Sequence, residues 1–182
     1  LSWIRIMAKI ELQNIAHSYN PQSVEQIYAL NPFNMTWEDG GRYAILGPSG
    51  CGKTTMLNIM SGIVQPSEGN LLFDGVDVTK RSTSERNIAQ VFQFPVIYGT
   101  MSVEQNLAFP LVCRNYEKPA IDAKVNEVAE ALGLQELLTK SASRLTADQK
   151  QLISLGRGLV RDDVAAVLMD EPLTVIDPDL KF

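Results

Sequence analysis

The sequence predicts an α/β fold, and features in three parts of its 182 residues indicate this class. Short β-type runs occupy residues 10–37 and 70–73, whereas the pattern changes to helical periodicity after residue 95. Between the early runs, a glycine-rich loop joins an apolar stretch to a helix-forming one. We therefore expect a β-rich core that is interrupted by an α-helical insertion.

The β-type runs of the first part lie at residues 10–15, 27–30 and 33–37, and the last of them alternates apolar and polar side chains. A Glu-Asp-Gly-Gly turn at residues 38–41 leads into an apolar strand at residues 42–46. A helix should follow at residues 53–63, then a loop at 65–69, a strand at 70–73 and a turn at 74–75. These elements predict an N-terminal antiparallel β subdomain around the glycine-rich loop.

The glycine-rich loop itself follows the pattern G-x-x-x-x-G-K-T, which is the phosphate-binding P-loop pattern. The glycines let successive backbone N–H groups point inward as an anion nest, with a helix N-terminus behind it. Lys53 can then reach the β- and γ-phosphates of a nucleoside triphosphate, and Thr54 can bind Mg²⁺. The alternative is a glycine-rich turn without a ligand. The residues assigned to the site are Gly47, Pro48, Ser49, Gly50, Cys51, Gly52, Lys53, Thr54 and Thr55.

The second half of the chain carries helix signals. Ser102 and Gln105 form a capping box, Pro119 opens a further helix, and Gly133 ends it. A short, uniformly apolar run at residues 165–169 then predicts a parallel strand that is covered on both faces. We expect residues 1–182 to form one domain: a core from residues 8–95 and 162–182, with a helical subdomain at residues 96–161.

Charge and composition limit the kinds of partner and the cellular compartment that we expect for the chain. The net charge of −5, from 16 basic and 21 acidic residues, argues against a nucleic-acid partner, which needs a basic surface. The longest uncharged apolar stretches fall far short of the roughly 20 residues that span a bilayer. The two cysteines, Cys51 and Cys113, suit reduced thiols in the cytosol. The first six residues do not resemble a secretory signal, and Met7 is a candidate native start.

Two adjacent carboxylates, Asp170 and Glu171, end the apolar run at residues 164–169. In α/β sheets, ligands bind at such strand ends. In P-loop enzymes the aspartate holds the Mg²⁺ that the loop threonine also binds, and the next acid can polarise the attacking water. On an extended backbone the two side chains point to opposite sides, so we expect different roles for them. The alternative is a solvated strand exit.

With these motifs, the chain resembles the nucleotide-binding subunit of ATP-binding cassette (ABC) transporters, from residue 8 to its end. Tyr19 matches the aromatic residue that stacks on adenine, with a core tyrosine as the alternative. Gln93 matches the Q-loop glutamine that contacts Mg²⁺ and water, with a polar residue closing a strand as the alternative. Residues 173–177 match the D-loop, and residues 145–149 stand where the family has its signature, Leu-Ser-Gly-Gly-Gln.

The resemblance implies a P-loop NTPase core with ATP and Mg²⁺ as cofactors. It implies that Thr54, Gln93 and Asp170 lie at the metal and that Glu171, Gln93 and Lys53 take part in catalysis. The implied partners are transmembrane permease subunits and a second ABC ATPase subunit, identical or different, with no nucleic acid. The implied location is peripheral, on the cytoplasmic side of the inner or plasma membrane.

Residues 93–101 correspond to the groove that receives a coupling helix of the permease. The segment at residues 94–98 (Phe-Pro-Val-Ile-Tyr) is unusually apolar for an exposed loop, and such patches mark partner surfaces. The alternative is a hairpin packed in the core.

The signature departs from the family pattern. Thr146 and Gln149 form a capping box, so a helix should begin there and run through Leu155. Ala147 and Asp148 replace both glycines of the family pattern. Asp148 should stabilise the free helix by about 0.3–1 kcal/mol and oppose an incoming phosphate. We expect the composite site that this signature completes to be weakened, unless Asp148 turns outward.

The family's switch histidine lies beyond the D-loop, and the chain ends at Phe182 before it. We therefore expect a C-terminally truncated domain with weak hydrolysis in isolation. His17 is the only histidine, and we expect it at the surface or in an edge strand.

The favoured function is an ATP-hydrolysing subunit that powers carbohydrate or polyol uptake. Residues 42–66 and 107–111 are similar to sugar and polyol importers, and residues 176–181 to a glycerol-type uptake system. One alternative is a regulatory subunit that binds ATP with little turnover. Another is a soluble ABC ATPase acting on ribosomes or DNA.

Overall fold

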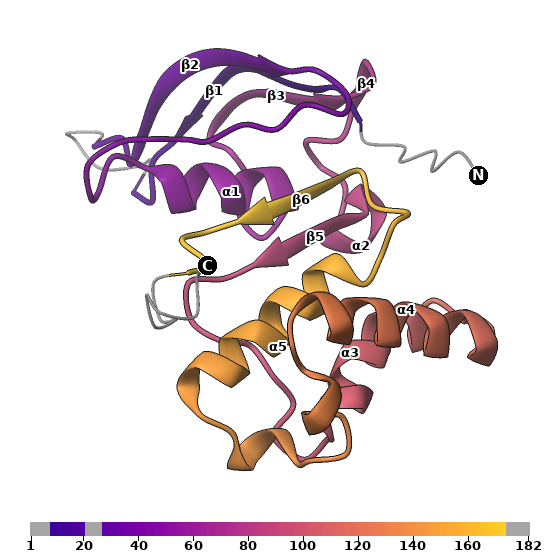
Figure 1. The fold of residues 1–182 in the computed structure, drawn as a ribbon. Helices are drawn as coiled ribbons and strands as arrows, with labels where there is room; N and C mark the ends of the chain where they lie inside the picture. Colours follow the sequence, from indigo (N-terminus) through magenta and orange to yellow (C-terminus); the bar gives the residue numbers. More distant parts are fainter. Residues whose placement is uncertain (1–7, 21–26, 174–182) are drawn as a thin grey trace. The chain divides into compact units, whose positions relative to one another are not determined.

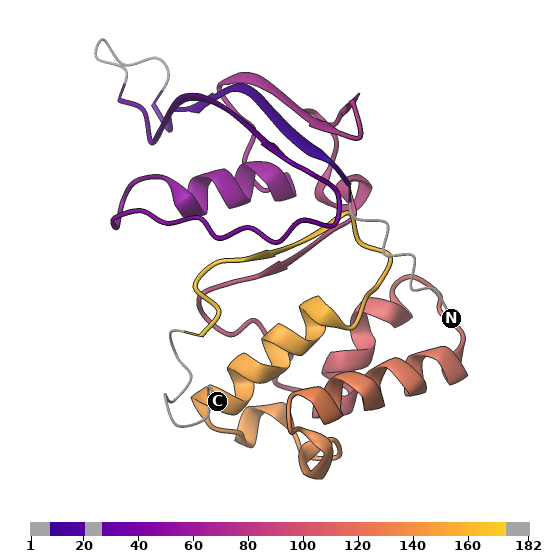
Figure 2. The ribbon, with the colours of Figure 1, turned by 45° about the horizontal axis from the view of Figure 1, so that its top comes forward.

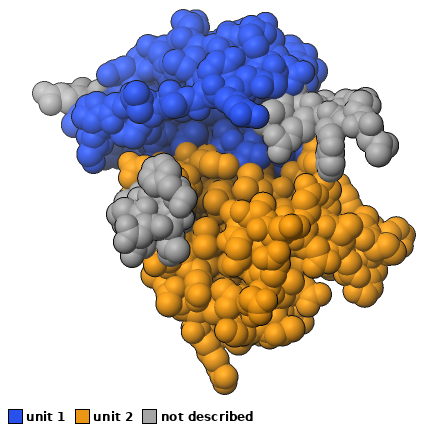
Figure 3. Space-filling model, in the orientation of Figure 1, with its two compact units in different colours: residues 1–88, 163–168 blue, residues 89–162, 169–182 orange. Residues whose placement is uncertain are grey.

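The computed structural model of the chain describes residues 8–20 and 27–173, and these residues belong to two compact units. Unit 1 comprises Leu1–Ile88 and Asp163–Leu168, and unit 2 comprises Ala89–Asp162 and Met169–Phe182 (Figure 3). Each unit has its own hydrophobic cluster. The candidate start at Met7 and residues 174–177 of the expected D-loop lie outside the described residues.

Unit 1 is built on a four-stranded sheet with the strand order β2-β1-β3-β4, in which neighbouring strands are antiparallel. The strands are β1 (Ile10–His17), β2 (Leu30–Trp37), β3 (Glu68–Phe73) and β4 (Val76–Asp77). Helix α1 (Lys53–Ser61) lies along one face of this sheet (Figure 1). The strands predicted at residues 10–15, 33–37 and 70–73 and the helix after the glycine-rich loop are therefore confirmed.

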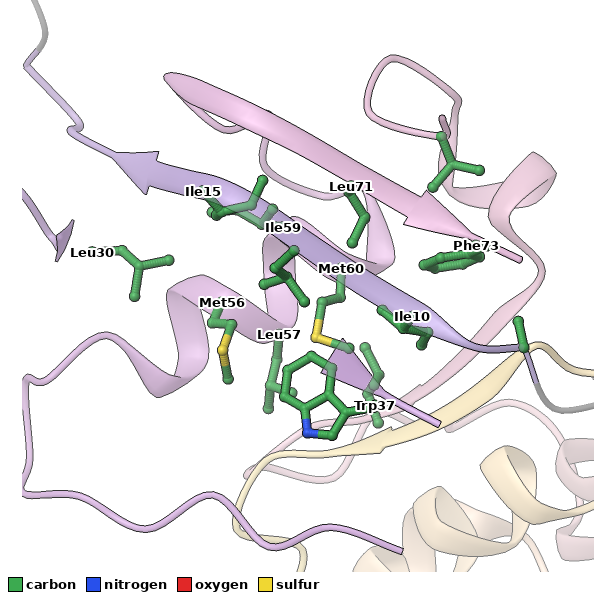
Figure 4. Close-up of a cluster of buried hydrophobic side chains, with 14 residues drawn as sticks. Ile10, Ile15, Leu30, Trp37, Met56, Leu57, Ile59, Met60, Leu71 and Phe73 are labelled. Atoms are coloured by element: carbon green, nitrogen blue, oxygen red, sulfur yellow. The ribbon is translucent and has the colours of Figure 1, made fainter. Parts of the chain in front are cut away.

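The core of unit 1 forms where α1 meets the sheet (Figure 4). Apolar side chains of the strands point toward the helix, and in β3 they alternate because successive residues of a strand face opposite sides. In β1 the register shifts after Leu12, so the next buried side chain is that of Ile15. Met56, Leu57, Ile59 and Met60 of α1 are buried against them. The strand residues in this cluster include Ile10, Leu12, Ile15, Leu30, Trp37, Leu71 and Phe73. This packing fixes α1, and with it the loop at its N-terminus.

Two predicted β-type runs do not form as expected. Residues 42–46 are not a strand, and the side chains of Tyr43 and Leu46 are exposed. A strand needs hydrogen bonds from a neighbour, and no described segment pairs with these residues. The run at residues 27–30 contributes only Leu30, the first residue of β2. At residues 42–46 local apolarity suggested a strand for which the described residues provide no pairing partner, whereas at residues 27–30 pairing with β1 begins only at the end of the run, where the N–H of Ala29 donates to the carbonyl of His17 at 2.9 Å.

The C-terminal end of α1 is held by Arg86 of the short helix α2 (Thr83–Arg86). Arg86 is 1% exposed, and its guanidinium donates to the carbonyls of Ile59, Met60, Thr79 and Arg81. Burial lowers the pKa of Arg86. This arginine therefore satisfies carbonyls that the end of a helix leaves unpaired.

Unit 2 contains three packed helices, α3 (Val103–Val112), α4 (Lys118–Ala131) and α5 (Ala147–Leu159) (Figure 2). Short 3₁₀ turns at Gln135–Leu137 and Ala142–Arg144 connect α4 to α5. The predicted capping boxes of α3 and α5 are both present, and Gly133 has the positive φ of 64° that follows the end of α4. Their core includes Val103, Leu107, Leu111, Val125, Ala129 and Ile153.

Strands β5 (Ile88–Val91) and β6 (Ala166–Met169) form a second, two-stranded sheet, and the boundary between the units passes through both strands. Within unit 1, the N–H of Ala165 donates to the carbonyl of Asn87 at 2.9 Å. Within unit 2, the N–H of Asp170 donates to the carbonyl of Val91 at 2.9 Å. The described helices include none that is long and apolar enough to cross a membrane.

Candidate functional site

The glycine-rich loop owes its path to two left-handed glycines. Gly50 and Gly52 have φ angles of 80° and 94°, which side chains disfavour. A Cβ atom on Gly52 would lie 2.6 Å from the carbonyl oxygen of Ala29, whereas one on Gly50 would meet nothing within 4 Å. Gly52 is therefore required both for its conformation and for the close approach of the neighbouring backbone.

The N-terminus of α1 has the composition of an anion site. Its N-cap is Gly52, which has no side chain to cap the helix, and its first turn contains no acidic residue. The ammonium of Lys53 donates to the carbonyls of Gly47 at 2.8 Å and Pro48 at 3.0 Å, so the cation lies against the loop. Helix N–H groups, the positive end of the helix dipole and a lysine together fit a phosphate group.

Tyr19 lies beside the first turn of α1. Its hydroxyl is 3.2 Å from the hydroxyl of Thr55, and its side chain is 64% exposed. The ring meets the ring of His17 edge-on, with centroids 4.5 Å apart. The exposure excludes the alternative of a core tyrosine and leaves an aromatic surface next to the loop, as stacking on a base requires.

His17 differs from the expectation of a surface or edge-strand residue. It lies in β1, which has β2 and β3 as neighbours on its two sides, and it is 8% exposed. Its Nδ1 is 3.4 Å from the hydroxyl of Ser67. The expectation was wrong because the sequence did not show that β1 has a neighbour on both sides.

Gln93 and Glu171 form a hydrogen-bonded pair in unit 2. The amide Nε2 of Gln93 donates to Oε2 of Glu171 at 3.3 Å. Asp170 is buried and Glu171 is exposed, so the two acids lie in different surroundings. The extended backbone expected through both acids is wrong: β6 ends at Met169, and Glu171 has a φ of 45° in the left-handed region.

The altered signature begins α5. The hydroxyl of Thr146 accepts from the N–H of Gln149 at 3.3 Å, and the Gln149 side chain accepts from the N–H of Thr146 at 3.2 Å. Asp148 lies in the first helical turn, as predicted. The N-terminus of α5 is thus partly satisfied by side chains of its own and carries a negative charge.

The apolar segment at residues 94–98 is an exposed loop, so the alternative of a hairpin packed in the core is wrong. Phe94 is 70% exposed and Val96 is 50% exposed. The guanidinium of Arg157 lies 4.5 Å from the ring centre of Tyr98 and donates to the carbonyl of Val96. The loop therefore presents apolar side chains while α5 holds its backbone.

The predicted site residues are divided between the units. The glycine-rich loop and Tyr19 belong to unit 1, whereas Gln93, Asp170 and Glu171 belong to unit 2. A single Mg²⁺ bound by Thr54, Gln93 and Asp170 stays a prediction. The described residues contain no group of three or more His, Cys, Asp or Glu residues suited to a metal. Mg²⁺ in triphosphate sites needs only one or two carboxylates, because phosphates and water complete its shell, so this donor set fits.

Sequence reasoning missed one residue at this site, Gln151. It is buried in unit 2 and donates to the carbonyls of Phe92 and Pro172. The signal was a glutamine on the buried side of a predicted helix, where a polar side chain needs partners.

Comparisons with known proteins show what the chain is similar to. The family model described as ABC transporter matches residues 30–174. The trehalose import ATP-binding protein SugC of Mycobacterium tuberculosis is 40% identical over 175 residues, which are 96% of this chain and 43% of that protein. The multiple sugar-binding transport ATP-binding protein MsmK of Streptococcus mutans is 38% identical over 168 residues, 92% of this chain and 44% of that protein. The chain thus spans less than half the length of these curated relatives.

Solved structures of ATP-binding cassettes share the fold. The dimeric post-hydrolysis cassette MJ0796 bound to ADP and Pi matches with a TM-score of 0.82 and 25% identity, over 94% of this chain and 77% of that one. A nucleotide-free cassette from an ABC transporter matches with a TM-score of 0.75 and 25% identity, over 96% of this chain and 73% of that one. The chain belongs to the ATP-binding cassette family of ABC transporters.

Proposed function

We propose that this chain is the ATP-binding and ATP-hydrolysing part of a subunit that powers carbohydrate or polyol uptake through a membrane ABC transporter. The observation that carries the proposal is the N-terminus of α1, which has a left-handed glycine as its N-cap, no acid in its first turn, and Lys53 against the loop. The sugar-import names of the relatives SugC and MsmK support the substrate class.

In this proposal the N–H groups of the loop and of α1 bind the β- and γ-phosphates. Lys53 exchanges its bonds to the carbonyls of Gly47 and Pro48 for bonds to phosphate oxygens, which are stronger acceptors because they are charged. The ring of Tyr19 stacks on the adenine. Each contact fixes the triphosphate without reacting with it, so catalysis rests on positioning and charge.

Water then attacks the γ-phosphorus in line, a new P–O bond forms, and the bond to the bridging oxygen of ADP breaks. Glu171 orients this water and accepts its proton, while Gln93, which donates to Glu171 at 3.3 Å, holds the carboxylate in place. A bound Mg²⁺ would neutralise charge on the phosphates, and Thr54, Gln93 and Asp170 are the residues that would hold it. Lys53 stabilises the charge that the leaving ADP gains.

The proposed partners are permease subunits and a second ATPase subunit, with the protein peripheral on the cytoplasmic side of the membrane. The exposed side chains of Phe94, Val96 and Tyr98 suit a contact with a coupling helix, because apolar loop surfaces mark partner sites. The dimeric cassette MJ0796 supports pairing of two cassettes.

A second candidate function is a regulatory subunit that binds ATP with little turnover. The feature that favours it is the N-terminus of α5, where a capping box and Asp148 replace the open glycines of the family signature. This feature concerns the site completed in a partner, whereas Lys53, Asp170 and Glu171 keep the residue types needed for hydrolysis in this chain.

The decisive experiment compares the full-length protein with its Glu171→Gln variant, each assembled with its permeases in proteoliposomes. The parent should hydrolyse Mg-ATP and drive uptake of a sugar, whereas Glu171→Gln should retain ATP unhydrolysed, because an amide cannot accept the proton from water. Radiolabelled trehalose and glycerol would distinguish a disaccharide from a small polyol.

A matched control is Glu104→Gln, since Glu104 lies in the first turn of α3 and has no assigned role in the reaction. It should hydrolyse ATP at the parental rate. A parent that retains ATP as tightly as Glu171→Gln would favour the regulatory function instead.

A further inference from the structure

Gln151 of α5 bridges two backbone segments that carry predicted catalytic residues. Its side chain is fully buried, and Nε2 donates to the carbonyl of Phe92 at 3.2 Å and to that of Pro172 at 2.9 Å. Among the described residues, its Oε1 has no hydrogen-bond partner. The side chain therefore acts as a double donor between residues far apart in the sequence.

The two carbonyls flank the hydrogen-bonded pair of the site. Phe92 directly precedes Gln93, and Pro172 directly follows Glu171. Gln93 donates to Glu171 at 3.3 Å, so a closed ring of contacts runs from Gln151 through both segments and back. Loss of either bond to Gln151 would therefore release one of the two segments that carry this pair.

The backbone at Glu171 needs such support. Its φ of 45° lies in the left-handed region, which costs a non-glycine residue free energy and persists where the surroundings fix it. On its N-terminal side, the N–H of Asp170 donates to the carbonyl of Val91 at 2.9 Å. On its C-terminal side, Gln151 holds the carbonyl of Pro172. The turn that aims Glu171 is thus fixed at both ends.

Helix α5 also holds the residues after Gln93. The N–H of Val96 donates to the hydroxyl of Ser154 at 3.3 Å, and Arg157 donates to the carbonyl of Val96. A Cβ atom on Gly158 would lie 2.6 Å from the side chain of Val91, so the helix approaches the segment closely there as well. Gln151 of α5 binds the residue next to Gln93 and the residue next to Glu171.

We propose that Gln151 is a positioning residue for ATP hydrolysis, which holds Gln93 and the strained turn at Glu171 in the geometry that activates water. The inference rests on the proposed function, because it concerns the same reaction. Gln151 touches neither nucleotide nor water in this role; it acts through the two peptides that it joins.

The test is Gln151→Met in the full-length protein with its permeases. Methionine has a similar length and no donor, so both bridging bonds are lost with little change in volume. We expect kcat for ATP to fall about 10- to 100-fold, the size of effect that a misplacement of about 1 Å produces, while KM for ATP stays within about twofold. Gln105→Met is the control, since it replaces a glutamine by methionine in the capping box of α3, away from the residues predicted to act on ATP. Its kcat should stay at the parental value.

A second measurement separates positioning from a general weakening of α5. In a Glu171→Gln background, ATP-dependent dimer formation should be the same with and without Gln151→Met, because binding does not need the water geometry. A double-mutant cycle with Gln93→Ala should be strongly non-additive, because both changes release the same contact.

An unchanged kcat for Gln151→Met would overturn the inference, as would loss of the dimer in the Glu171→Gln background. A parent protein that does not hydrolyse ATP would overturn the proposed function instead, so the two failures are distinguishable.

Discussion

Helices α1 and α5 both begin where a phosphate group is expected, but their N-termini differ in the N-cap residue and in the charge of the first turn. At α1 the N-cap is Gly52, the first turn has no acid, and Lys53 lies against the loop. At α5 the N-cap is Thr146, whose hydroxyl accepts from Gln149, and Asp148 lies in the first turn. The first end is open to an anion, and the second is partly satisfied by its own chain.

The difference teaches that a helix N-terminus alone does not make a phosphate site. Its N–H groups must be left without side-chain acceptors, and its dipole must not be neutralised by a nearby carboxylate. Helix α3 makes the point again, because its start has the same two devices as α5, a capping box at Ser102 and an acid at Glu104. The start of α5 therefore has the two features that stabilise a helix N-terminus, a capping box and a first-turn acid.

The largest expected effect comes from giving α1 the acid that α5 carries. Thr54 occupies the second helical position of α1, as Asp148 does in α5. Thr54→Asp should weaken ATP binding by about 2–4 kcal/mol, because like charges about 4 Å apart at a protein surface repel on that scale. Calorimetry without Mg²⁺ would measure this and exclude the loss of the metal-binding hydroxyl.

Thr54→Asn is the matched control, since the asparagine side chain has the same shape as that of aspartate but no charge. It should lose less than about 1 kcal/mol of binding free energy, the worth of an ordinary neutral hydrogen bond. Equal losses in both variants would contradict the role that we assign to the uncharged first turn.

A smaller effect, the difference in stability between two glycine variants, tests why α1 has a glycine N-cap where α5 has a threonine. Gly50→Ala should lower the free energy of unfolding by about 1–2 kcal/mol, because it adds only the strain of a left-handed alanine. Gly52→Ala adds a Cβ atom 2.6 Å from the carbonyl of Ala29, so it should cost about 1–3 kcal/mol more than Gly50→Ala. Urea unfolding of the two variants gives the difference, and equal midpoints would show that the neighbouring backbone yields without cost.

The sequence predicted the starts of these helices because they are local. A capping box joins residues three apart, and the glycine spacing of the loop is readable within one segment. The same holds for α4, whose first turn at Pro119 and end before Gly133 were both expected. Where a feature depends on neighbours in the chain, the pattern of residue types was sufficient.

Features that depend on distant partners were missed. Gln151 reaches a carbonyl 59 residues away, and Arg86 reaches one 27 residues away, so no local pattern shows which groups either side chain contacts. The strand expected at residues 42–46 depends on a pairing partner, and the left-handed turn at Glu171 depends on contacts at both of its ends. The residue types of the site were predictable, whereas the contacts that aim them were not.

The smallest effect comes from removing the acid of α5, which tests the comparison from its other side. Asp148→Asn should raise the ATPase rate of the assembled transporter about two- to fivefold, because a first-turn carboxylate interacts with a helix dipole by about 0.3–1 kcal/mol. Glu104→Gln makes the same change in the first turn of α3 and should leave the rate unchanged. Both variants should lose a similar, small amount of stability in thermal unfolding. A rise in neither variant would mean that Asp148 turns away from the phosphate, and the start of α5 would then differ from that of α1 only in its capping box.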